Sequence, residues 1–410
     1  MSPSLKIVNI GQLATFDPGS GSVEKMDRLE IAIEKGRVVE MAEKLPPADD
    51  ELDAGGRLVT PGWVDPHTHP VFARTREDEF AMRVAGESYE EIAAAGGGIK
   101  ASVQALREID EERLTALVRQ RLQGFLSHGT TTIEAKSGYG LSTESELKSL
   151  RVLRRAAREA HTEVVPTFLG AHDFPQEYIQ DTRAYVDLVC QEMIPAVDRE
   201  NMAEYCDVFC EKGWFSVADA RRILTVAREH GLKLRLHADE FQDSGAASLA
   251  AELKAHSADH LAHISDNAIE QMAESGTVAV LLPGTTFFLG RRDYAPARKL
   301  MEAGIPVALG SDFNPGSSMI QSMSFIVSLA CLYLGMSLDE AFAAATYQAA
   351  RSLDRHDVVG SVRPGMQADL IIWNLTSLTE IPYHVATSRV GRVIKSGRVA
   401  FSLDNNGHRR

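Results

Sequence analysis

The middle of the chain alternates short runs of apolar, often β-branched residues with longer amphipathic patterns, and this alternation restricts the fold most. Short apolar runs bounded by turns are typical of buried strands, and repeated strand–helix units are typical of parallel sheets. Helical patterns occupy, for example, Glu111–Leu126, Glu144–Ala160 and Asp219–Glu229. The predicted strands are Trp63–Asp65, Thr131–Ala135, Val164–Gly170, Cys206–Cys210, Lys233–Leu236, Ala258–Leu261, Val278–Leu282 and Pro306–Gly310. This count and spacing predict a (β/α)8 TIM-like barrel of about 250 residues.

Both ends of the chain differ from this middle, because they contain short strands separated by turns. Clusters such as Asp17-Pro18-Gly19 and Pro364-Gly365 mark the turns. The predicted strands are Ser4–Asn9, Leu29–Ile33, Arg37–Met41 and Arg57–Thr60 near the start, and Gly360–Arg363, Asp369–Trp373 and Arg389–Val399 near the end. We therefore predict an α/β protein in which residues 61–362 form the barrel and residues 1–60 plus 363–410 form one small composite β-sandwich domain.

Charge and composition exclude several classes of partner. The 410 residues include 43 basic and 57 acidic ones, which gives a formal net charge of −14. A nucleic acid or an anionic membrane would require a basic face, so neither is expected as a partner. No run approaches the roughly 18 apolar residues of a membrane helix, and the start lacks a signal-peptide pattern. Four scattered cysteines do not suggest a disulfide framework, and we expect a cytoplasmic protein.

Metal-binding and titratable side chains stand at the ends of several predicted barrel strands, which is the end where barrel active sites lie. His67 and His69 follow the first strand with one residue between them, so both imidazoles point to the same side of an extended backbone. Together with His237 and Asp312, they offer three nitrogens and one oxygen to a zinc or iron ion. The other strand-end side chains on this face are His172, Glu240, Asp259 and His260.

Other motifs have simpler explanations. Cys206 and Cys210 lack the two-residue spacing of a zinc knuckle and are expected to be buried core thiols. Lys136 ends the second strand, where we interpret it either as a structural residue or as one that supports the site residues from behind. Residues 90–98, which include Gly96–Gly98, show no nucleotide-binding fingerprint and are predicted to form a mobile loop near the barrel mouth.

Several sequence blocks resemble a known superfamily. Pro61–His69 resembles the first-strand signature of the amidohydrolase superfamily, and Ala308–Asp312 resembles its eighth-strand aspartate. Five further blocks resemble the imidazolonepropionase family within that superfamily: Thr75–Phe80, Glu134–Leu141, Phe168–His172, His237–Phe241 and Asp312–Ser317. The blocks occur in the same order over essentially the whole chain.

The resemblance implies hydrolysis of 4-imidazolone-5-propanoate to N-formimidoyl-L-glutamate, a step of histidine degradation. It implies one zinc or iron ion per chain and a homodimer. The metal ligands would be His67, His69, His237 and Asp312. The substrate contacts would be Arg76, Tyr139, His172, Glu240, Asn314, Gly316 and Ser317.

The chemistry of the side chains suggests catalytic roles for three residues. Asp312, near both metal and water, can accept a proton from the water. His260 can donate a hydrogen bond to the developing oxyanion, and Glu240 can carry a proton to the leaving ring nitrogen. The division of proton transfer between Asp312 and Glu240 stays open. Arg76 is the expected partner of the substrate carboxylate, although it could instead be a surface arginine paired with Glu77 or Glu79.

Alternatives remain at the level of the reaction. Another cyclic amidohydrolase or a deaminase of the same superfamily would share the metal ligands but not Arg76 with Tyr139. A scaffold protein without activity would be expected to have lost ligands. Dinuclear members of the superfamily carry a bridging lysine after the fourth strand, where this chain has Lys212, but the closer resemblance implies a single metal.

Overall fold

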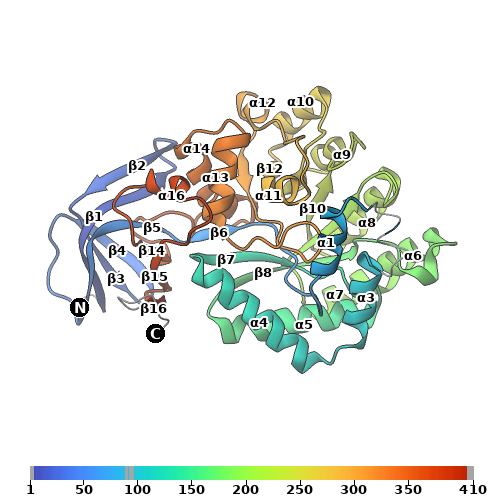
Figure 1. Ribbon diagram of the computed structural model, residues 1–410, viewed down its shortest axis with the longest axis horizontal. Coiled ribbons are helices and arrows are strands. Elements are labelled where there is room, and N and C mark those ends of the chain that lie inside the picture. The colour runs from blue at the N-terminus through green and yellow to red at the C-terminus, as the bar shows by residue number, and fades with distance from the viewer. Residues whose placement is uncertain (1–3, 88–90, 92–96, 404–410) are drawn as a thin grey trace.

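The computed structural model describes residues 4–87, 91 and 97–403, which form two eight-stranded sheets surrounded by helices (Figure 1). One sheet is built from the middle of the chain and the other from its two ends. Among these residues, no helix combines the length and the apolar character needed to cross a membrane. Most of the predicted loop at residues 90–98 lies outside the described residues.

The middle of the chain forms a parallel sheet whose strands follow one another in sequence order. Each strand pairs with the next, and a bridge between Thr68 and Phe313 joins the first strand end to the last, so the barrel is nearly closed. The (β/α)8 prediction is confirmed, and every strand lies within two residues of its expected bounds. The strands are β6 (Trp63–Asp65), β7 (Thr130–Lys136), β8 (Glu163–Ala171), β9 (Tyr205–Cys210), β10 (Lys233–Ala238), β11 (Ser257–His260), β12 (Val278–Leu281) and β13 (Val307–Leu309).

Helices cover the outside of the barrel and bury their apolar faces against it. The three predicted helices are present and begin at capping residues, Asp110, Ser142 and Ser216, whose side chains accept hydrogen bonds from the first helical turn. The helices on the first half of the barrel are α1 (Glu77–Val84), α3 (Ile99–Glu108), α4 (Glu111–Ser127), α5 (Thr143–Ala160), α6 (Thr182–Leu188) and α7 (Ile194–Arg199), with a 3-10 turn at Gln176–Tyr178 and a π-turn at Val189–Met193. Those that follow are α8 (Val217–Glu229), α9 (Ala246–Glu252), α10 (Asp266–Ser275), α11 (Pro283–Phe288), α12 (Ala297–Glu302), α13 (Met323–Tyr333), α14 (Leu338–Ala344), α15 (Tyr347–Ser352) and α16 (Glu380–Tyr383).

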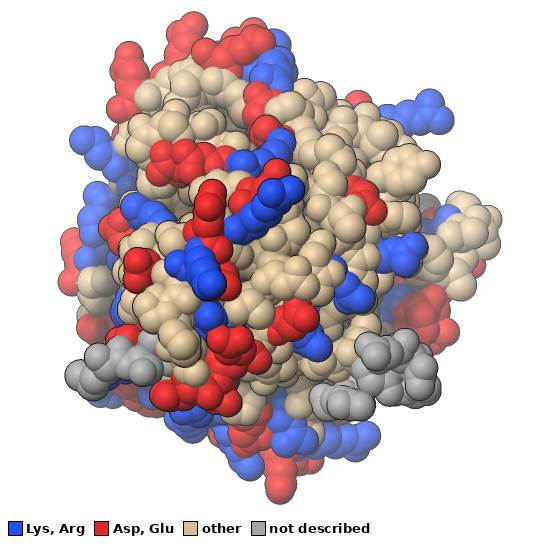
Figure 2. All heavy atoms as spheres, turned by 90° about the vertical axis from the view of Figure 1, so that its left-hand side faces the viewer, with Lys and Arg blue, Asp and Glu red and all other residues tan. Residues whose placement is uncertain are grey.

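The second sheet joins the two ends of the chain, as predicted. Its strand order is β16-β15-β14-β5-β1-β3-β4, with β2 paired to β1. Buried apolar residues of this sheet form a core cluster separate from those of the barrel. All strands are hydrogen-bonded into one continuous sheet. Acidic and basic side chains are interspersed over this side of the molecule (Figure 2). The strands are β1 (Leu5–Asp17), β2 (Ser22–Asp27), β3 (Glu30–Glu34), β4 (Arg37–Ala42), β5 (Asp50–Pro61), β14 (Leu370–Trp373), β15 (Val390–Lys395) and β16 (Arg398–Ser402).

One strand prediction near the end of the chain is wrong. Gly360–Arg363 is not a strand, because Gly360 has a φ of 90° and side chains of β1 replace the ladder: Thr15 Oγ1 accepts from the Val362 amide, 2.7 Å away. The predicted strand Arg389–Val399 is a hairpin of β15 and β16 that turns at Ser396. The structure also adds β2, in which the apolar residues Val23 and Met26 are half-buried and do not alternate with polar ones at a spacing of two.

The chain passes directly from β5 of the terminal sheet into β6 of the barrel. At the junction a Cβ on Gly62 would lie 2.3 Å from Thr131 Oγ1, so no larger residue fits. Trp63 packs edge-on against Trp373 of β14, with ring centroids 5.8 Å apart. The terminal sheet therefore lies at the amino-terminal end of β6, opposite the end that carries His67 and His69 (Figure 1). We propose the domain boundaries at residues 60/61 and 362/363, close to this crossing point.

Candidate active site

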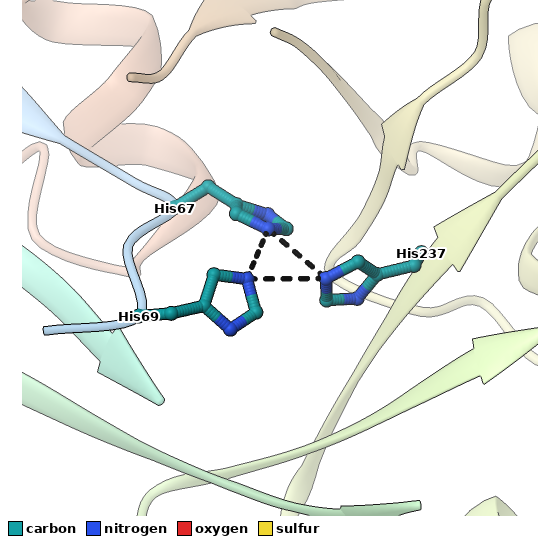
Figure 3. A group of neighbouring side chains, drawn as sticks. All are labelled: His67, His69 and His237. Atoms are coloured by element: carbon teal, nitrogen blue, oxygen red, sulfur yellow. Dashed lines mark hydrogen bonds between the residues drawn. The ribbon is translucent and has the colours of Figure 1, made fainter. Parts of the chain in front are cut away.

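Three imidazoles converge at the carboxyl-terminal end of the barrel strands. His67 and His69 follow β6, and His237 lies near the end of β10. Their Nε2 atoms form a triangle: 3.2 Å from His67 to His69, 3.1 Å from His67 to His237, and 3.3 Å from His237 to His69 (Figure 3). All three side chains are buried. The structure thus brings together three of the four predicted metal ligands at one point.

Asp312, the fourth predicted ligand, closes this group. Its Oδ1 lies 3.5 Å from His67 Nε2 and 3.3 Å from His69 Nε2, and its Oδ2 accepts a hydrogen bond from Thr285 Oγ1, 2.5 Å away. Ligand atoms on a tetrahedral zinc ion with bonds of about 2.0–2.1 Å lie about 3.3–3.4 Å apart. The separations among the three imidazole nitrogens, and those from Asp312 Oδ1 to His67 and His69, therefore suit a zinc-type ion.

Burial keeps the imidazoles of His67 and His69 uncharged, as metal binding requires. Burial, together with nearby Lys136 and His237, holds the pKa of His67 well below its usual range, and burial and His237 do the same for His69. His67 Nδ1 donates to Asp259 Oδ2, 2.6 Å away, so the proton of the neutral ring is on Nδ1. The Nε2 lone pair of His67 is thus free for an ion. His67, His260 and Asp312 form a second, overlapping group of possible ligands.

The backbone is strained where two of these side chains leave the barrel. His260, at the end of β11, has a φ of 80°, and Asp312, after β13, has a φ of 52°. Non-glycine residues rarely adopt such angles, and those that do are concentrated at functional sites. The strain turns both side chains towards the common point instead of continuing the strand.

Glu240, the predicted proton carrier, and His260, the predicted donor to the oxyanion, lie beside this point. His260 Nε2 is 3.6 Å from Glu240 Oε2 and has no hydrogen-bond partner among the described residues. Burial, reinforced by Asp312, raises the pKa of Glu240 well above its usual value. Burial lowers the pKa of His260 to about 3, so this ring is neutral near pH 7. The pair can therefore offer a donor and a proton to a bound molecule.

A cavity of about 710 Å³ opens above the histidines, and the predicted substrate residues line it. His172 stacks on His69, with ring centroids 5.1 Å apart, and its Nδ1 donates to the carbonyl oxygen of Gly138 at 2.9 Å. Tyr139 packs against both rings. The predicted residues on the wall are His69, Arg76, Tyr139, His172, His237, Glu240, His260, Asp312, Asn314, Gly316 and Ser317.

Arg76 is neither a free cation nor a surface arginine. Its Nε and Nη2 donate to the two carboxylate oxygens of Glu79, at 2.8 and 2.5 Å, and only 14% of its side chain is exposed. The remaining nitrogen, Nη1, faces Gly316, where an added Cβ would lie 2.6 Å from it. Asn314 holds the same turn, because its Oδ1 accepts from the amides of Gly316 and Ser317 at 2.8 and 2.7 Å. Glu79 thus orients Arg76, and glycine at 316 makes room for it.

Several residues of the site were not predicted. Thr285 holds Asp312, and Arg83, whose Nη1 donates to the Gly316 carbonyl at 2.9 Å, lines the cavity with Arg291. Asp207 and Arg235 lie buried beneath the histidines. Asp207 and Arg235 are charged residues that face inward on consecutive strands, and this pattern could have indicated them. It can be recognised only when the register of the strands is known. Lys136 is buried between Glu134 and Asp207 and does not line the cavity, whereas Lys212 is exposed on the cavity wall.

Comparisons with known proteins agree with this geometry. The amidohydrolase family matches residues 58–400. The chain is 47% identical to an imidazolonepropionase of Symbiobacterium thermophilum, over 96% of both chains, and 46% identical to one of Geobacillus kaustophilus, over 96% of this chain and 92% of the relative.

Among solved structures, an adenosine deaminase from Xanthomonas campestris with bound zinc superposes with a TM-score of 0.74 at 18% identity, covering 97% of this chain and 93% of the other. A 5-methylcytosine deaminase from Klebsiella pneumoniae gives a TM-score of 0.74 at 19% identity, with 97% and 98% coverage. These two matches show the fold alone. The family match and the close relatives go further: this chain belongs to the amidohydrolase family and, within it, to the imidazolonepropionases.

Proposed function

We propose that the chain hydrolyses the cyclic amide of 4-imidazolone-5-propanoate and releases N-formimidoyl-L-glutamate, the reaction expected in histidine degradation. One observation carries the proposal: a single cavity is lined by His69, His237 and Asp312 of the proposed metal site and by Arg76, a largely buried arginine that Glu79 orients. A small cyclic amide with a carboxylate arm needs both features. A nucleobase, the usual substrate of a deaminase, has no carboxylate for Arg76 to bind.

We propose that one zinc or iron ion per chain is held by His67, His69, His237 and Asp312. When bound, such an ion lowers the pKa of water to about 7 and polarises a carbonyl group. The neutral imidazoles of His67 and His69 and the separations of the three Nε2 atoms support this assignment. Burial of the group excludes bulk water, which strengthens every charge interaction inside the site.

The surrounding side chains supply the proton transfers of the hydrolysis. The oxygen of water adds to the ring carbonyl carbon while Asp312 accepts the water proton. His260 donates a hydrogen bond to the resulting oxyanion. The carbonyl carbon–nitrogen bond then breaks, and the leaving ring nitrogen takes a proton delivered by Glu240. The carbonyl carbon becomes a carboxylate of the glutamate product.

The other wall residues hold the substrate in the orientation for this attack. Arg76 pairs with the propionate through Nη1, the nitrogen that Glu79 leaves free, and Tyr139 adds its hydroxyl. His172 contacts the imidazolone ring. Asn314, Gly316 and Ser317 enclose the propionate end of the cavity.

We also propose that the protein works as a homodimer in the cytoplasm, without a nucleic acid or a membrane as partner. The net charge of −14 supports the last two points, because either partner would favour a basic surface.

A direct assay tests the proposal. The purified protein, loaded with zinc or ferrous iron, is mixed with freshly made 4-imidazolone-5-propanoate, and N-formimidoyl-glutamate is measured by mass spectrometry. We expect product in the loaded protein and a loss of turnover with a chelator. A matched control is the double variant His67→Ala/His69→Ala. Absence of product from the loaded protein, or ammonia release from adenosine or cytosine instead, would contradict the proposed reaction.

A further inference from the structure

A layer of charged side chains lies directly beneath the three histidines, inside the barrel. Lys136 comes from β7, Asp207 from β9, Arg235 from β10 and Asp259 from β11, and all four side chains are completely buried. Burying isolated charges in this way is costly, so buried ions are retained only where they are paired and hydrogen-bonded. None of these four residues lines the cavity, so they do not touch the substrate.

The first pair supports His67. Asp259 Oδ2 accepts the Nδ1 proton of His67 at 2.6 Å and also accepts from Arg235 Nη2 at 3.1 Å. The same Nη2 donates to the carbonyl oxygen of Pro66, the residue before His67, at 2.8 Å. Arg235 therefore fixes both the carboxylate that holds the imidazole and the backbone that carries it. Arg235 Nη1 is anchored in turn on the carbonyl oxygen of Ser352, 3.1 Å away.

The second pair supports His237 in the same manner. Asp207 Oδ1 accepts from the backbone amide of His237 at 3.1 Å, and Oδ2 lies 3.0 Å from Nδ1 of the same residue. Lys136 Nζ lies 2.8 Å from Asp207 Oδ2 and donates to Glu134 Oε1 at 2.7 Å. The side-chain contact between Asp207 and His237 is less well aligned than the hydrogen bond between Asp259 and His67.

His69 differs from the other two rings. Within the part of the chain that the structure describes, its Nδ1 has no hydrogen-bond partner and no carboxylate at ion-pair distance. Its ring is held instead by stacking on His172. Two of the three imidazoles thus have a carboxylate backed by a buried cation, and the third does not.

We propose that the Arg235–Asp259 and Lys136–Asp207 pairs are positioning devices, which keep His67 and His237 protonated on Nδ1 with both Nε2 atoms aimed at one point before an ion arrives. The inference rests on the proposed metal role of these histidines. A carboxylate behind a metal-binding imidazole fixes its tautomer and orientation and raises its basicity, and loss of such a partner typically weakens metal binding about 10–100-fold. The buried cations keep the two carboxylates in place.

The test measures zinc affinity without substrate. The dissociation constant of full-length protein is determined by competition with a chromophoric chelator for wild type, Asp259→Asn and Asp207→Asn. We expect the constant to rise about 10–100-fold, and more for Asp259→Asn because its hydrogen bond is better aligned. The matched control is Asp369→Asn, which removes a buried carboxylate paired with Lys395 at 2.6 Å in the terminal sheet. This control should bind zinc like the wild type.

A conservative exchange separates positioning from general packing. Arg235→Lys keeps a cation behind Asp259, whereas Arg235→Met removes it at similar length. We expect Arg235→Lys to retain more zinc affinity than Arg235→Met, and the visible spectrum of the cobalt-loaded protein to change only in the latter. Equal zinc constants for wild type and both aspartate variants would overturn the proposal, as would equal constants for the two arginine variants.

A measurement on the wild-type protein tests the proposal even if the variants do not fold. Nitrogen-15 spectra of histidine-labelled, metal-free protein report which ring nitrogen carries the proton. We expect Nδ1 for His67 and His237 and a less biased mixture for His69; a proton on Nε2 of His67 or His237 would overturn the proposal. Tight zinc binding without turnover of 4-imidazolone-5-propanoate would remove the proposed function alone. Normal turnover with unchanged zinc constants in the variants would remove the positioning role alone.

Discussion

The carboxyl end of the barrel and the terminal sheet both contain a buried ion pair and residues with positive φ, yet they use them differently. In the terminal sheet, Asp369 pairs with Lys395 and accepts from the amide of Ser396, whose own φ of 49° lies in the turn of the β15–β16 hairpin. In the barrel, Asp207 pairs with Lys136, and the residues with positive φ at the strand ends include His260 and Asp312.

The two regions differ in which buried polar atoms lack a hydrogen-bond partner within the protein. The Asp369 carboxylate has partners on both oxygens, so the pair completes a hairpin and its hydrogen bonds. At the barrel end, the Nε2 atoms of His67, His69 and His237 face one another, and His260 Nε2 has no partner among the described residues. Buried groups that the protein itself does not satisfy are expected where a ligand will satisfy them. The ion pair of the terminal sheet stabilises the fold, whereas the polar groups at the barrel end are arranged to bind a ligand.

Removing two imidazoles is the strongest way to break this comparison. His67→Ala/His69→Ala should lose all measurable turnover and bound metal, because two of the four converging ligands disappear. Circular dichroism should still show a folded protein, since the barrel core is built from other residues. Elemental analysis should give one metal per wild-type chain and none in the variant. Two metals per wild-type chain, or full activity without metal, would contradict the assignment.

Changing Glu240 or His260 should have the next largest effect. Glu240→Gln and His260→Asn keep the approximate shape of each side chain but remove the proton transfer or the aligned donor. We expect each variant to lose about 10²–10⁴ in kcat while retaining its metal. Steady-state kinetics with parallel metal analysis check this. Wild-type turnover in either variant would take that residue out of the chemical step.

Arg76 tests the substrate end of the cavity. Arg76→Met should raise KM strongly, with a loss of about 2–5 kcal/mol in apparent transition-state binding, because Glu79 is then left without its partner and the propionate without its cation. An analogue that lacks the carboxylate should be hydrolysed almost equally by both proteins. Normal KM for the propionate substrate in the variant would show that another group, such as Arg83 or Arg291, binds the carboxylate.

Gly316→Ala tests the role of Arg76 in substrate binding with a smaller change. The added methyl group would lie 2.6 Å from Arg76 Nη1, so the guanidinium must move while its charge is kept. We expect KM to rise roughly 5–30-fold, which corresponds to a loss of about 1–2 kcal/mol in binding free energy. The kcat for the carboxylate-free analogue should stay unchanged. An unchanged KM would mean that the position of Nη1 does not determine substrate binding.

Asp369→Asn should leave catalysis untouched and affect only stability. The loss should be at most about 3 kcal/mol, the low end for breaking a buried pair, because Glu163 remains 3.2 Å from Lys395. Urea denaturation should show a lower midpoint, and kcat and KM should match the wild type. A change in kcat would show that the two regions are coupled.

The sequence predicted the barrel well, because buried parallel strands read as apolar runs and their ends carry the reactive side chains. It failed for β2, in which only Val23 and Met26 are apolar and half-buried. It also failed for Gly360–Arg363, where single hydrogen bonds to Phe16 and Thr15 of β1 replace a ladder. The strand-end residues of the site follow from the rule that barrel active sites lie at strand ends, whereas Arg76, Tyr139, Asn314, Gly316 and Ser317 were expected only from the family resemblance. Asp207 and Arg235 could not be found in this way, since their roles depend on register: β9 sets Asp207 opposite Arg235, and β11 sets Asp259 opposite His237.

The pairing of β5 with β14 has a consequence for how the protein is made. Pro61 pairs with Leu370, so one edge of β5 stays uncovered until roughly 300 further residues have been synthesised, which takes about 15–60 s at 5–20 residues per second. An exposed strand edge is a template for wrong pairing during that interval. Chains that stop before β14 should therefore aggregate instead of releasing a free barrel, and the last strands act as the closing step of folding on the ribosome.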